Sequence, residues 1–273
     1  MCLIPSFCVF GWNIPSILTT TWNSYILLKT KQGFSMAEVQ KVNPNRTIIK
    51  QGDKLSFAQY TLSLAEAKFL AFVMAQIDMN DTEFKEYLIK VSDIAELTNA
   101  EQNETRLKKF AKTFQGKVIT LDSPNGDFTT FNWWHHITYV KGEARFLVQL
   151  HDYMKPLLLT FSSHFGKSSL LYISQMKSLY APRFYYMLRS FKAQYQNSFE
   201  IDLEELYAKL ELKKSLRQYN QFKTFVLTPS VEEINRITDL NVEWKESQKI
   251  GKKVTRIRFE FTKKEKDLLD FIS

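Results

Sequence analysis

The alternation of apolar and polar positions predicts a series of elements that occurs twice along the chain. In the first half, one helical face carries apolar side chains at Leu62, Ala65, Phe69, Val73 and Ile77. Ser63 and Glu66 fit the S-x-x-E capping box that opens many helices. We therefore predict a core helix that runs from Ser63 to about residue 77.

The rest of the first half predicts a short strand, a short helix, a basic helix and a hairpin. The expected ranges are 87–91 for the strand, 93–97 for a helix capped by Ser92, 101–114 for the basic helix, and 118–121, 131–134 and 144–150 for further strands. The turn at 123–126 contains Asn125 and Gly126, and an Asn-Gly dipeptide is typical of hairpin turns.

The second half repeats this order. The expected ranges are 172–191 for a helix, 199–201 for a strand, 203–210 for a helix, 213–236 for a long basic helix, and 241–244 and 254–261 for a hairpin with its tip at 247–253. Asp202 and Glu205 predict a second capping box. Pro229 is expected to kink or divide the basic helix, because proline lacks an amide donor. Its expected apolar face consists of Phe222, Phe225, Val226, Ile234 and Ile237.

A helix, a strand, two helices and a hairpin are the order of the winged helix-turn-helix arrangement, in which the last helix is the recognition helix. We therefore predict an α+β fold of two tandem winged-helix domains. The expected boundaries are 1–35 for a leader, 36–159 and 160–262 for the two domains, and 263–273 for a C-terminal tail.

Charge is unevenly divided between the two predicted domains. Of the net charge of +8, residues 36–159 contribute nothing, with 15 basic and 15 acidic side chains, whereas residues 160–273 hold 20 basic and 14 acidic ones. A basic second domain beside a neutral first one predicts a polyanionic partner that the second domain contacts more.

Glycine and cysteine are scarce, which excludes several classes of site. The chain has 8 glycines and neither GxGxxG nor GxxxxGK[ST], so we expect no nucleotide cofactor and no ATPase activity. Cys2 and Cys8 are the two cysteines, both near the N-terminus, which fits a reducing, cytosolic compartment. The first cation is Lys29, whereas a secretory signal starts with a basic region. We interpret residues 1–35 as a disordered leader or as sequence upstream of a true start at Met36, and expect no membrane role.

The long basic segment and the second hairpin carry the chemistry of DNA recognition. Arginine can bind guanine O6 and N7, amide side chains can bind adenine N6 and N7, and lysines bind phosphates. The predicted DNA-binding residues on the helix are Lys213, Lys214, Arg217, Gln218, Asn220, Gln221 and Lys223, with Thr224 beside them, and those on the hairpin are Lys249, Lys252, Lys253, Arg256 and Arg258. Arg256 and Arg258 are expected to share one face of their strand. A solvated polar face is the alternative reading of the helix taken alone.

The basic helix of the first domain predicts weaker contacts. Its cations are Arg106, Lys108, Lys109 and Lys112, but Glu101 and Glu104 lower the net positive charge of this helix. We expect this helix to contact the DNA backbone rather than to read bases.

Two histidines next to two tryptophans suggest a metal-dependent nickase as an alternative. His135 and His136 are adjacent, so on a strand they would point to opposite faces, and His151 and His164 lie outside any ligand spacing with them. We therefore expect no metal site and no catalytic residues. The tyrosines at 172, 180, 185 and 186 are interpreted as core or groove-lining aromatics rather than nucleophiles.

Several segments in this order resemble the plasmid replication initiators of the RepB/RepE type, the Rep_3 superfamily. The matching segments are V-N-P-N at 42–45 with I-I-K at 48–50, M-K-S-L-Y at 176–180 with R-F-Y-Y-M-L at 183–188, F-K at 222–223 with V-L-T-P-S-V-E-E-I-N at 226–235, and K-K-V at 252–254 continuing to residue 259.

This resemblance implies two winged-helix domains related by pseudo-two-fold symmetry. It also implies a protein that binds repeated double-stranded origin sites, called iterons, as a monomer, melts an AT-rich region, and recruits host initiator and helicase proteins. A dimer, held mainly through the first domain, would repress the initiator's own promoter. Two other functions stay open at this point: a winged-helix transcriptional regulator, which would bind an inverted repeat, and a nickase or relaxase, which would form a covalent tyrosyl adduct with DNA.

Overall fold

The computed structural model describes residues 48–78, 80–98, 103–159 and 165–264. The expected leader with its cysteines and Met36, the segment at 42–45, Glu101, His164 and most of the C-terminal tail lie outside the described residues. Within the described ranges, no helix is both long and apolar enough to span a bilayer.

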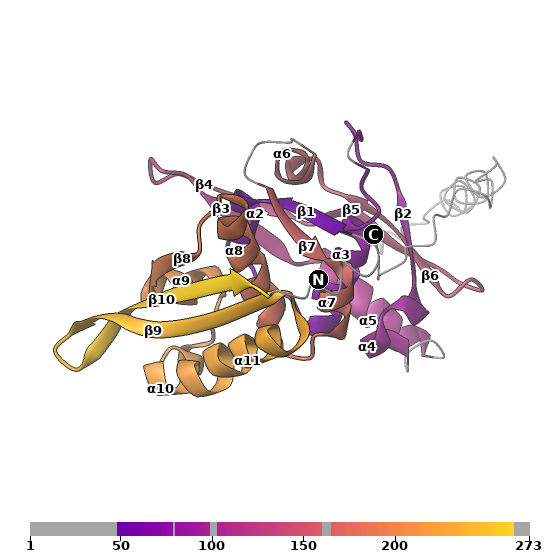
Figure 1. The fold of residues 1–273 in the computed structure, drawn as a ribbon. Helices are drawn as coiled ribbons and strands as arrows, with labels where there is room; N and C mark the ends of the chain where they lie inside the picture. Colours follow the sequence, from indigo (N-terminus) through magenta and orange to yellow (C-terminus); the bar gives the residue numbers. More distant parts are fainter. Residues whose placement is uncertain (1–47, 79, 99–102, 160–164, 265–273) are drawn as a thin grey trace, which may run out of the picture. The chain divides into compact units, whose positions relative to one another are not determined.

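The first described strand pairs with a strand from the middle of the chain. β1 (Ile48–Gly52) runs antiparallel to β7 (Phe165–Ser169), with Ile48 opposite Ser169 and Gly52 opposite Phe165. The short α2 (Asp53–Ser56) follows, and its Asp53 carboxylate accepts hydrogen bonds from Ser190 and, at 2.7 Å, from Gln194. These contacts hold α2 against α8 (Ala181–Ala193; Figure 1).

The first winged-helix domain follows the predicted order. α3 (Leu64–Met74) begins with the predicted capping box of Ser63 and Glu66, and ends three residues early because the amides of Gln76 and Ile77 bind i−3 carbonyls. β2 (Tyr87–Lys90), α4 (Ala95–Thr98) and α5 (Glu104–Gln115) follow. The predicted Ser92 cap is wrong: Ser92 lies inside a 3-10 turn, and the extended Ile94 separates that turn from α4.

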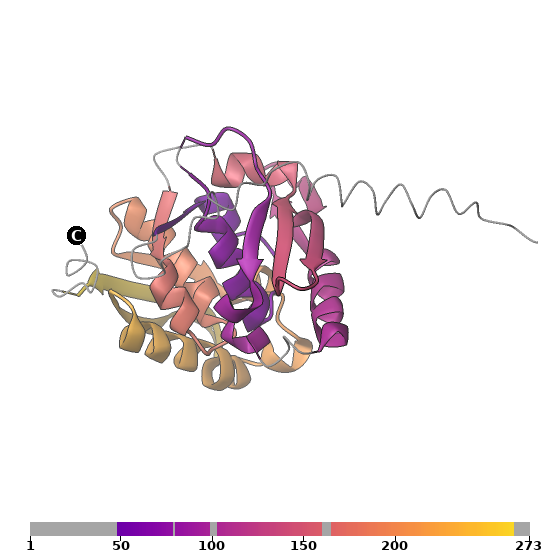
Figure 2. The same cartoon turned by 90° about the vertical axis from the view of Figure 1, so that its right-hand side faces the viewer.

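The first domain has two hairpins where the sequence predicted one. β3 (Val118–Asp122) and β4 (Phe128–Asn132) form the hairpin with the Asn-Gly turn, in which Gly126 has φ 91°. β5 (Trp134–Val140) and β6 (Arg145–Leu150) form a second hairpin, which joins β2 in a sheet of order β2-β6-β5. α5 packs against β5 (Figure 2). β5 was missed because residues 136–140 are all half-buried and lack a clear alternation.

The chain has two helices where the sequence predicted the single helix 172–191. α7 (Leu170–Gln175) ends before an extended Met176, and α8 (Ala181–Ala193) has proline in its first turn. Between them, the Glu233 carboxylate accepts the amides of Lys177 at 3.0 Å and Ser178 at 2.8 Å. Pro182 cannot donate within a continuous helix, and Glu233 supplies the acceptor that replaces helical hydrogen bonds.

The remaining elements complete the second winged-helix domain. β8 (Ser198–Asp202) and α9 (Leu203–Lys209) lead to α10 (Tyr219–Phe222) and α11 (Thr228–Ile237), and then to β9 (Leu240–Ile250) and β10 (Lys253–Lys263). The sheet order β8-β10-β9 matches β2-β6-β5 of the first domain. Asp202 caps α9, but its side chain accepts the amide of Glu204 at 2.9 Å, so the predicted capping box with Glu205 is not formed.

α8 lies between the two domains and is almost entirely buried. Tyr185 and Tyr186 are core residues on it, as is Tyr172 on α7, which confirms their interpretation as packing aromatics. Arg183 is also buried: its Nη2 donates to the carbonyl oxygens of Ala58 at 2.7 Å and Lys209 at 3.2 Å, and the guanidinium lies 3.5 Å from the ring centroid of Tyr60. α8 therefore couples the first domain to the elements that carry the basic segment.

Candidate nucleic-acid interface

The basic segment of the second domain begins as a 3-10 turn, not as a helix. Residues Lys214–Leu216 form that turn, and Gln218 is extended, so the helix starts at Tyr219. The prediction of a helix from Lys213 is wrong for its first six residues, because Gln218, with ψ 127°, separates the turn from the helix. Lys213, Lys214, Arg217 and Gln218 are nevertheless all exposed, on the loop that enters the helix.

Pro229 distorts this helix without dividing it. α10 continues through a π turn (Lys223–Leu227) into α11, and the backbone torsion angles stay helical from Phe222 to Thr228. Proline lacks an amide donor, and the Ser230 hydroxyl binds the Val226 carbonyl at 2.6 Å. The helix from Tyr219 to Ile237 is therefore one continuous rod with a wide turn near its centre.

One face of this helix is buried and the other presents polar groups. Phe222, Val226 and Leu227 are fully buried, whereas Asn220, Gln221, Lys223 and Thr224 are exposed. The prediction that Phe225 belongs to the apolar face is wrong, because Phe225 is 61% exposed. The π turn buries Val226 and Leu227 in succession, which leaves Phe225 on the polar side.

Two long side chains near the start of the helix, Arg217 and Lys223, contact other parts of the protein. Arg217 donates from Nε to the Leu212 carbonyl at 2.9 Å, and Lys223 lies with Nζ 5.3 Å from the ring centroid of Trp244. Lys213 and Lys214 have no carboxylate within 4 Å among the residues that the structure describes.

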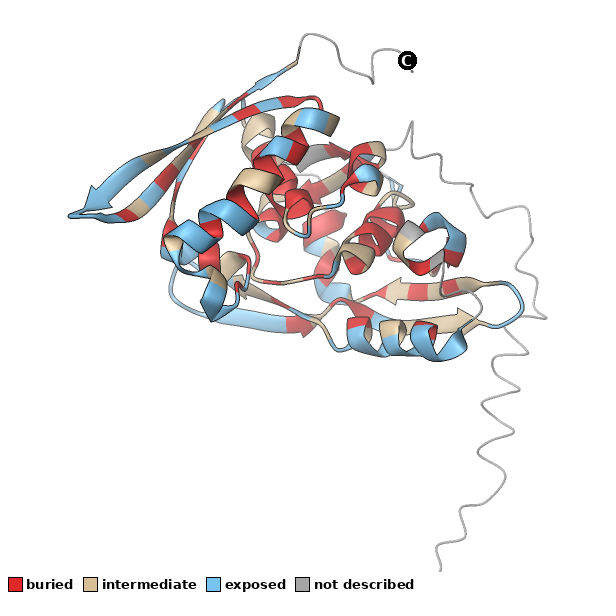
Figure 3. Cartoon of the chain, turned by 90° about the horizontal axis from the view of Figure 1, so that it is seen from below, coloured by how far each residue is buried: buried red, intermediate tan, exposed pale blue. Residues whose placement is uncertain are grey.

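The hairpin β9–β10 is longer than the sequence suggested. Its strands continue to Ile250 and Lys253, so the predicted tip at 247–253 is wrong and the turn itself is Gly251–Lys252, with Gly251 at φ 61°. The hairpin extends past α10 in Figure 1, and Figure 3 shows its far end as exposed. α11 packs on β9, which places the basic hairpin beside the helix as a wing.

A hydrogen-bonded chain joins the start of the helix to the wing. The Tyr219 hydroxyl donates to Glu246 at 2.7 Å, and Lys249 pairs with the same carboxylate at 2.6 Å. These two contacts hold the pKa of Glu246 below its usual range. Tyr219 and Glu246 were not predicted as site residues, although Glu246 lies at period-two spacing from Trp244 along β9.

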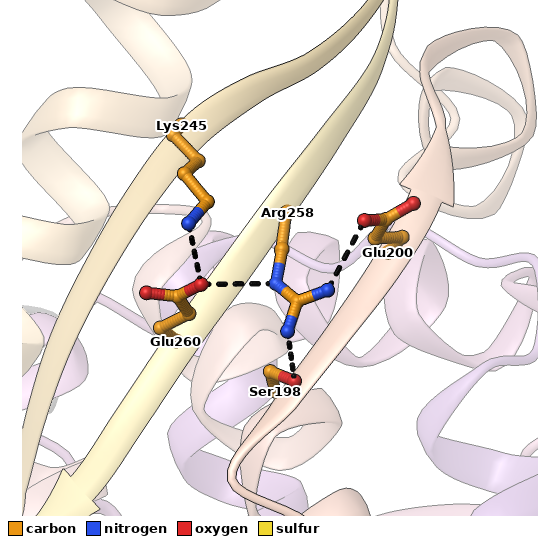
Figure 4. A network of polar contacts seen from close by, with 5 residues as sticks. All are labelled: Ser198, Glu200, Lys245, Arg258 and Glu260. Carbon is orange, nitrogen blue, oxygen red and sulfur yellow. Dashed lines mark hydrogen bonds and ion pairs between the residues drawn. The ribbon is translucent and has the colours of Figure 1, made fainter.

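Some of the predicted wing cations are neutralised by acids from other elements. Arg258 contacts Glu200 on β8 at 3.3 Å, Glu260 at 3.0 Å and the Ser198 hydroxyl at 2.9 Å, and Lys245 joins the same Glu260 (Figure 4). Lys253 approaches Glu204 of α9 at 3.5 Å.

Arg256 and Arg258 do share one face, with the buried Ile257 between them. Arg256 and Lys252, however, have no carboxylate within 4 Å in the described part of the chain. These two side chains carry the uncompensated positive charge of the wing.

The first domain presents cations of a different kind. Arg106, Lys108, Lys109 and Lys112 are all exposed on α5, and Asn103 caps the helix. Glu104 pairs with Lys141 in the β5–β6 turn at 2.8 Å, so that carboxylate is partly neutralised. α5 thus displays lysines and an arginine but no amide on this face before Gln115.

The two adjacent histidines are held apart by separate partners. His135 Nε2 lies 3.2 Å from Asp152, and its ring stacks on His151, whereas His136 Nε2 lies 3.2 Å from Glu86. In the described residues, His, Cys, Asp and Glu side chains form no group of three or more that could hold a metal ion.

Comparisons with known proteins agree with this geometry. The profile described as "Initiator Replication protein, WH1" matches residues 48–189, and "Initiator Rep protein, WH2" matches residues 202–261. The solved structure titled "Crystal structure of Pi initiator protein in complex with iteron DNA" is similar with a TM-score of 0.64 and 21% sequence identity, covering 81% of this chain and 99% of that chain. The two tandem winged-helix domains are thus those of replication initiators, and the chain belongs to the initiator replication protein family.

Proposed function

We propose that the protein initiates plasmid replication by binding repeated double-stranded origin sites, or iterons, through both winged-helix domains in the bacterial cytosol. The observation that carries this proposal is the exposed helix from Tyr219 beside a wing whose Lys252 and Arg256 are uncompensated. A helix of this kind enters the major groove, and a basic wing contacts the flanking backbone. The similarity to the Pi initiator, solved on iteron DNA, supports the same kind of target.

Each predicted residue has a place in this proposal. Base edges would be contacted by Arg217, Gln218, Asn220 and Gln221. Phosphates would be bound by Lys213, Lys214, Lys223, Lys249, Lys252, Lys253 and Arg256. On another stretch of the DNA backbone, α5 would add contacts from Arg106, Lys108, Lys109 and Lys112. Arg258 is the predicted residue least available to DNA, because three side chains already bind its guanidinium.

The proposal includes no catalytic step. Binding at several iterons would promote opening of the origin and recruit host initiator and helicase proteins. A dimer of the same chain, held by the first domain (36–159), would repress its own promoter. The second domain (160–262) would be the main DNA reader.

Binding of the full chain to directly repeated duplex sites tests this function. Sites would be selected from a random duplex library, and affinity for them and for scrambled duplexes would be measured across a salt series. We expect preference for directly repeated sites and a steep loss of affinity as salt rises. Equal binding to both duplexes would leave a non-specific DNA-binding protein, and a preference for inverted repeats would favour a transcriptional regulator.

A further inference from the structure

Phe225 places an exposed aromatic ring on the polar side of the recognition helix. Its side chain is 61% exposed, whereas Phe222 and Val226 on either side of it are fully buried. The ring lies in the π turn Lys223–Leu227, and π turns inside α-helices are frequent at functional sites. The backbone distortion thus removes from the core a ring that regular helical spacing would have buried.

Most of this ring is uncovered in the described part of the protein. Phe225 makes no ring-stacking or cation–π contact there, whereas Phe222, three residues earlier, packs its ring on Tyr207. Its exposed neighbours are Gln221, one turn earlier, and Thr224. The adjacent cation, Lys223, lies over the ring of Trp244 on β9, with its Nζ 5.3 Å from the ring centroid.

The chemistry of the major groove offers one apolar partner for such a ring. Base pairs display hydrogen-bond donors and acceptors there, and the C5-methyl group of thymine is the apolar exception. An amide such as Gln221 can bind adenine in the same groove. A phenyl ring next to an amide therefore fits a stretch of A·T pairs.

We propose that Phe225 is a specificity-determining residue that packs against the C5-methyl group of a thymine in the bound site. This inference rests on the proposed function, because it requires the helix to lie in the major groove. The inference names one chemical group that the protein would recognise, the thymine methyl group, which hydrogen-bonding side chains alone would not select.

The test removes single methyl groups from the DNA. Each thymine of the selected site is replaced by deoxyuridine, which lacks only the C5-methyl group, and affinities are measured for the full-length wild-type chain, Phe225→Ala and Phe225→Leu. At one thymine we expect wild-type affinity to fall about four-fold, the effect of one buried methyl group. Phe225→Ala should not respond to deoxyuridine at that position, whereas Phe225→Leu, which keeps an apolar contact, should.

Binding to scrambled duplex is the control for folding. Because the ring is exposed, Phe225→Ala should bind scrambled DNA with wild-type affinity. The inference is overturned if both proteins respond equally to every deoxyuridine, or if Phe225→Ala binds the selected site as tightly as wild type. If wild type itself enriches no sequence, the proposed function fails as well.

Discussion

The two winged-helix domains share one order of elements but present different chemistry. The exposed face of α5 in the first domain carries cations, with Lys108, Lys109 and Lys112 as its main groups. The recognition helix of the second domain exposes one lysine, Lys223, together with the amides Asn220 and Gln221 and the ring of Phe225. Cations bind every phosphate alike, whereas amides and apolar groups distinguish bases. Two copies of one fold can thus differ in role, with cations that favour affinity on one copy and base-distinguishing groups that favour specificity on the other.

The wings of the two domains differ in the opposite sense. Both cations of the β5–β6 hairpin are paired in the first domain, Lys141 with Glu104 of α5 and Arg145 with Glu143. The β9–β10 wing is long, and Lys252 at its turn has no carboxylate partner among the described residues. If the protein binds DNA as proposed, we expect the second domain to contact the backbone with its wing and the first domain to contact it with α5.

The largest effect is expected from the core beneath the recognition helix. Phe222→Ala removes a fully buried ring that packs on Tyr207, with centroids 4.9 Å apart, and should lower the free energy of unfolding by about 3–5 kcal/mol. Urea unfolding followed by far-UV circular dichroism measures this. Phe225→Ala is the matched control and should change stability by no more than about 0.5 kcal/mol. Similar losses in both variants would contradict the assignment of the two faces.

The next largest effect is expected when a side chain that would contact bases, Arg217 of the second domain, is removed. Arg217 keeps its Nη groups without a hydrogen-bond partner in the described part of the chain, since only Nε binds Leu212. Arg217→Ala should weaken binding to the selected site by about 1–3 kcal/mol and leave binding to scrambled duplex unchanged. Fluorescence anisotropy with both duplexes checks this, and an equal loss on both would make Arg217 a phosphate contact.

Sequence patterns predicted the order of elements because that order depends on local signals. The capping box at Ser63, the Asn-Gly turn and the period-two strands all lie within a few neighbouring residues. The break between α7 and α8 was not predicted, although Pro182 is a local signal for it, and the acceptor that stabilises the break, Glu233, is 56 residues away from Lys177. Local periodicity carries no information about such a partner.

The candidate site was predictable in composition but not in geometry. The hairpin cations Lys249 to Arg258 follow one another without an intervening acid, yet Arg258 is neutralised by Glu200, 58 residues away. The exposure of Phe225 depends on a π turn that helical spacing does not anticipate. Residue types therefore indicate the ligand, whereas the three-dimensional pairing decides which side chains are available to it.

Phosphate contacts should give smaller and uniform effects in both domains. Lys109→Ala in α5 and Lys252→Ala in the wing each remove one exposed cation. Each should weaken binding to the selected and the scrambled duplex alike, and should lower the slope of log affinity against log salt by about 0.9. Salt titrations of both variants measure the slope. A loss confined to the selected site in Lys109→Ala would show that the first domain also reads bases, and would remove the contrast between the domains.

The smallest effect is expected at the neutralised arginine of the wing. Arg258 is held by Glu200, Glu260 and Ser198, whereas Arg256, two residues earlier on the same face, has no carboxylate partner in the described structure. Arg258→Gln should therefore leave the salt slope of DNA binding unchanged, and Arg256→Gln should lower it by about 0.9. Both variants remove one charge from the same strand. A difference between their salt slopes would therefore report a direct DNA contact by Arg256 rather than a change in overall charge. If the two slopes fell equally, DNA would have to displace the carboxylates from Arg258, and the wing would contact the backbone along its whole length.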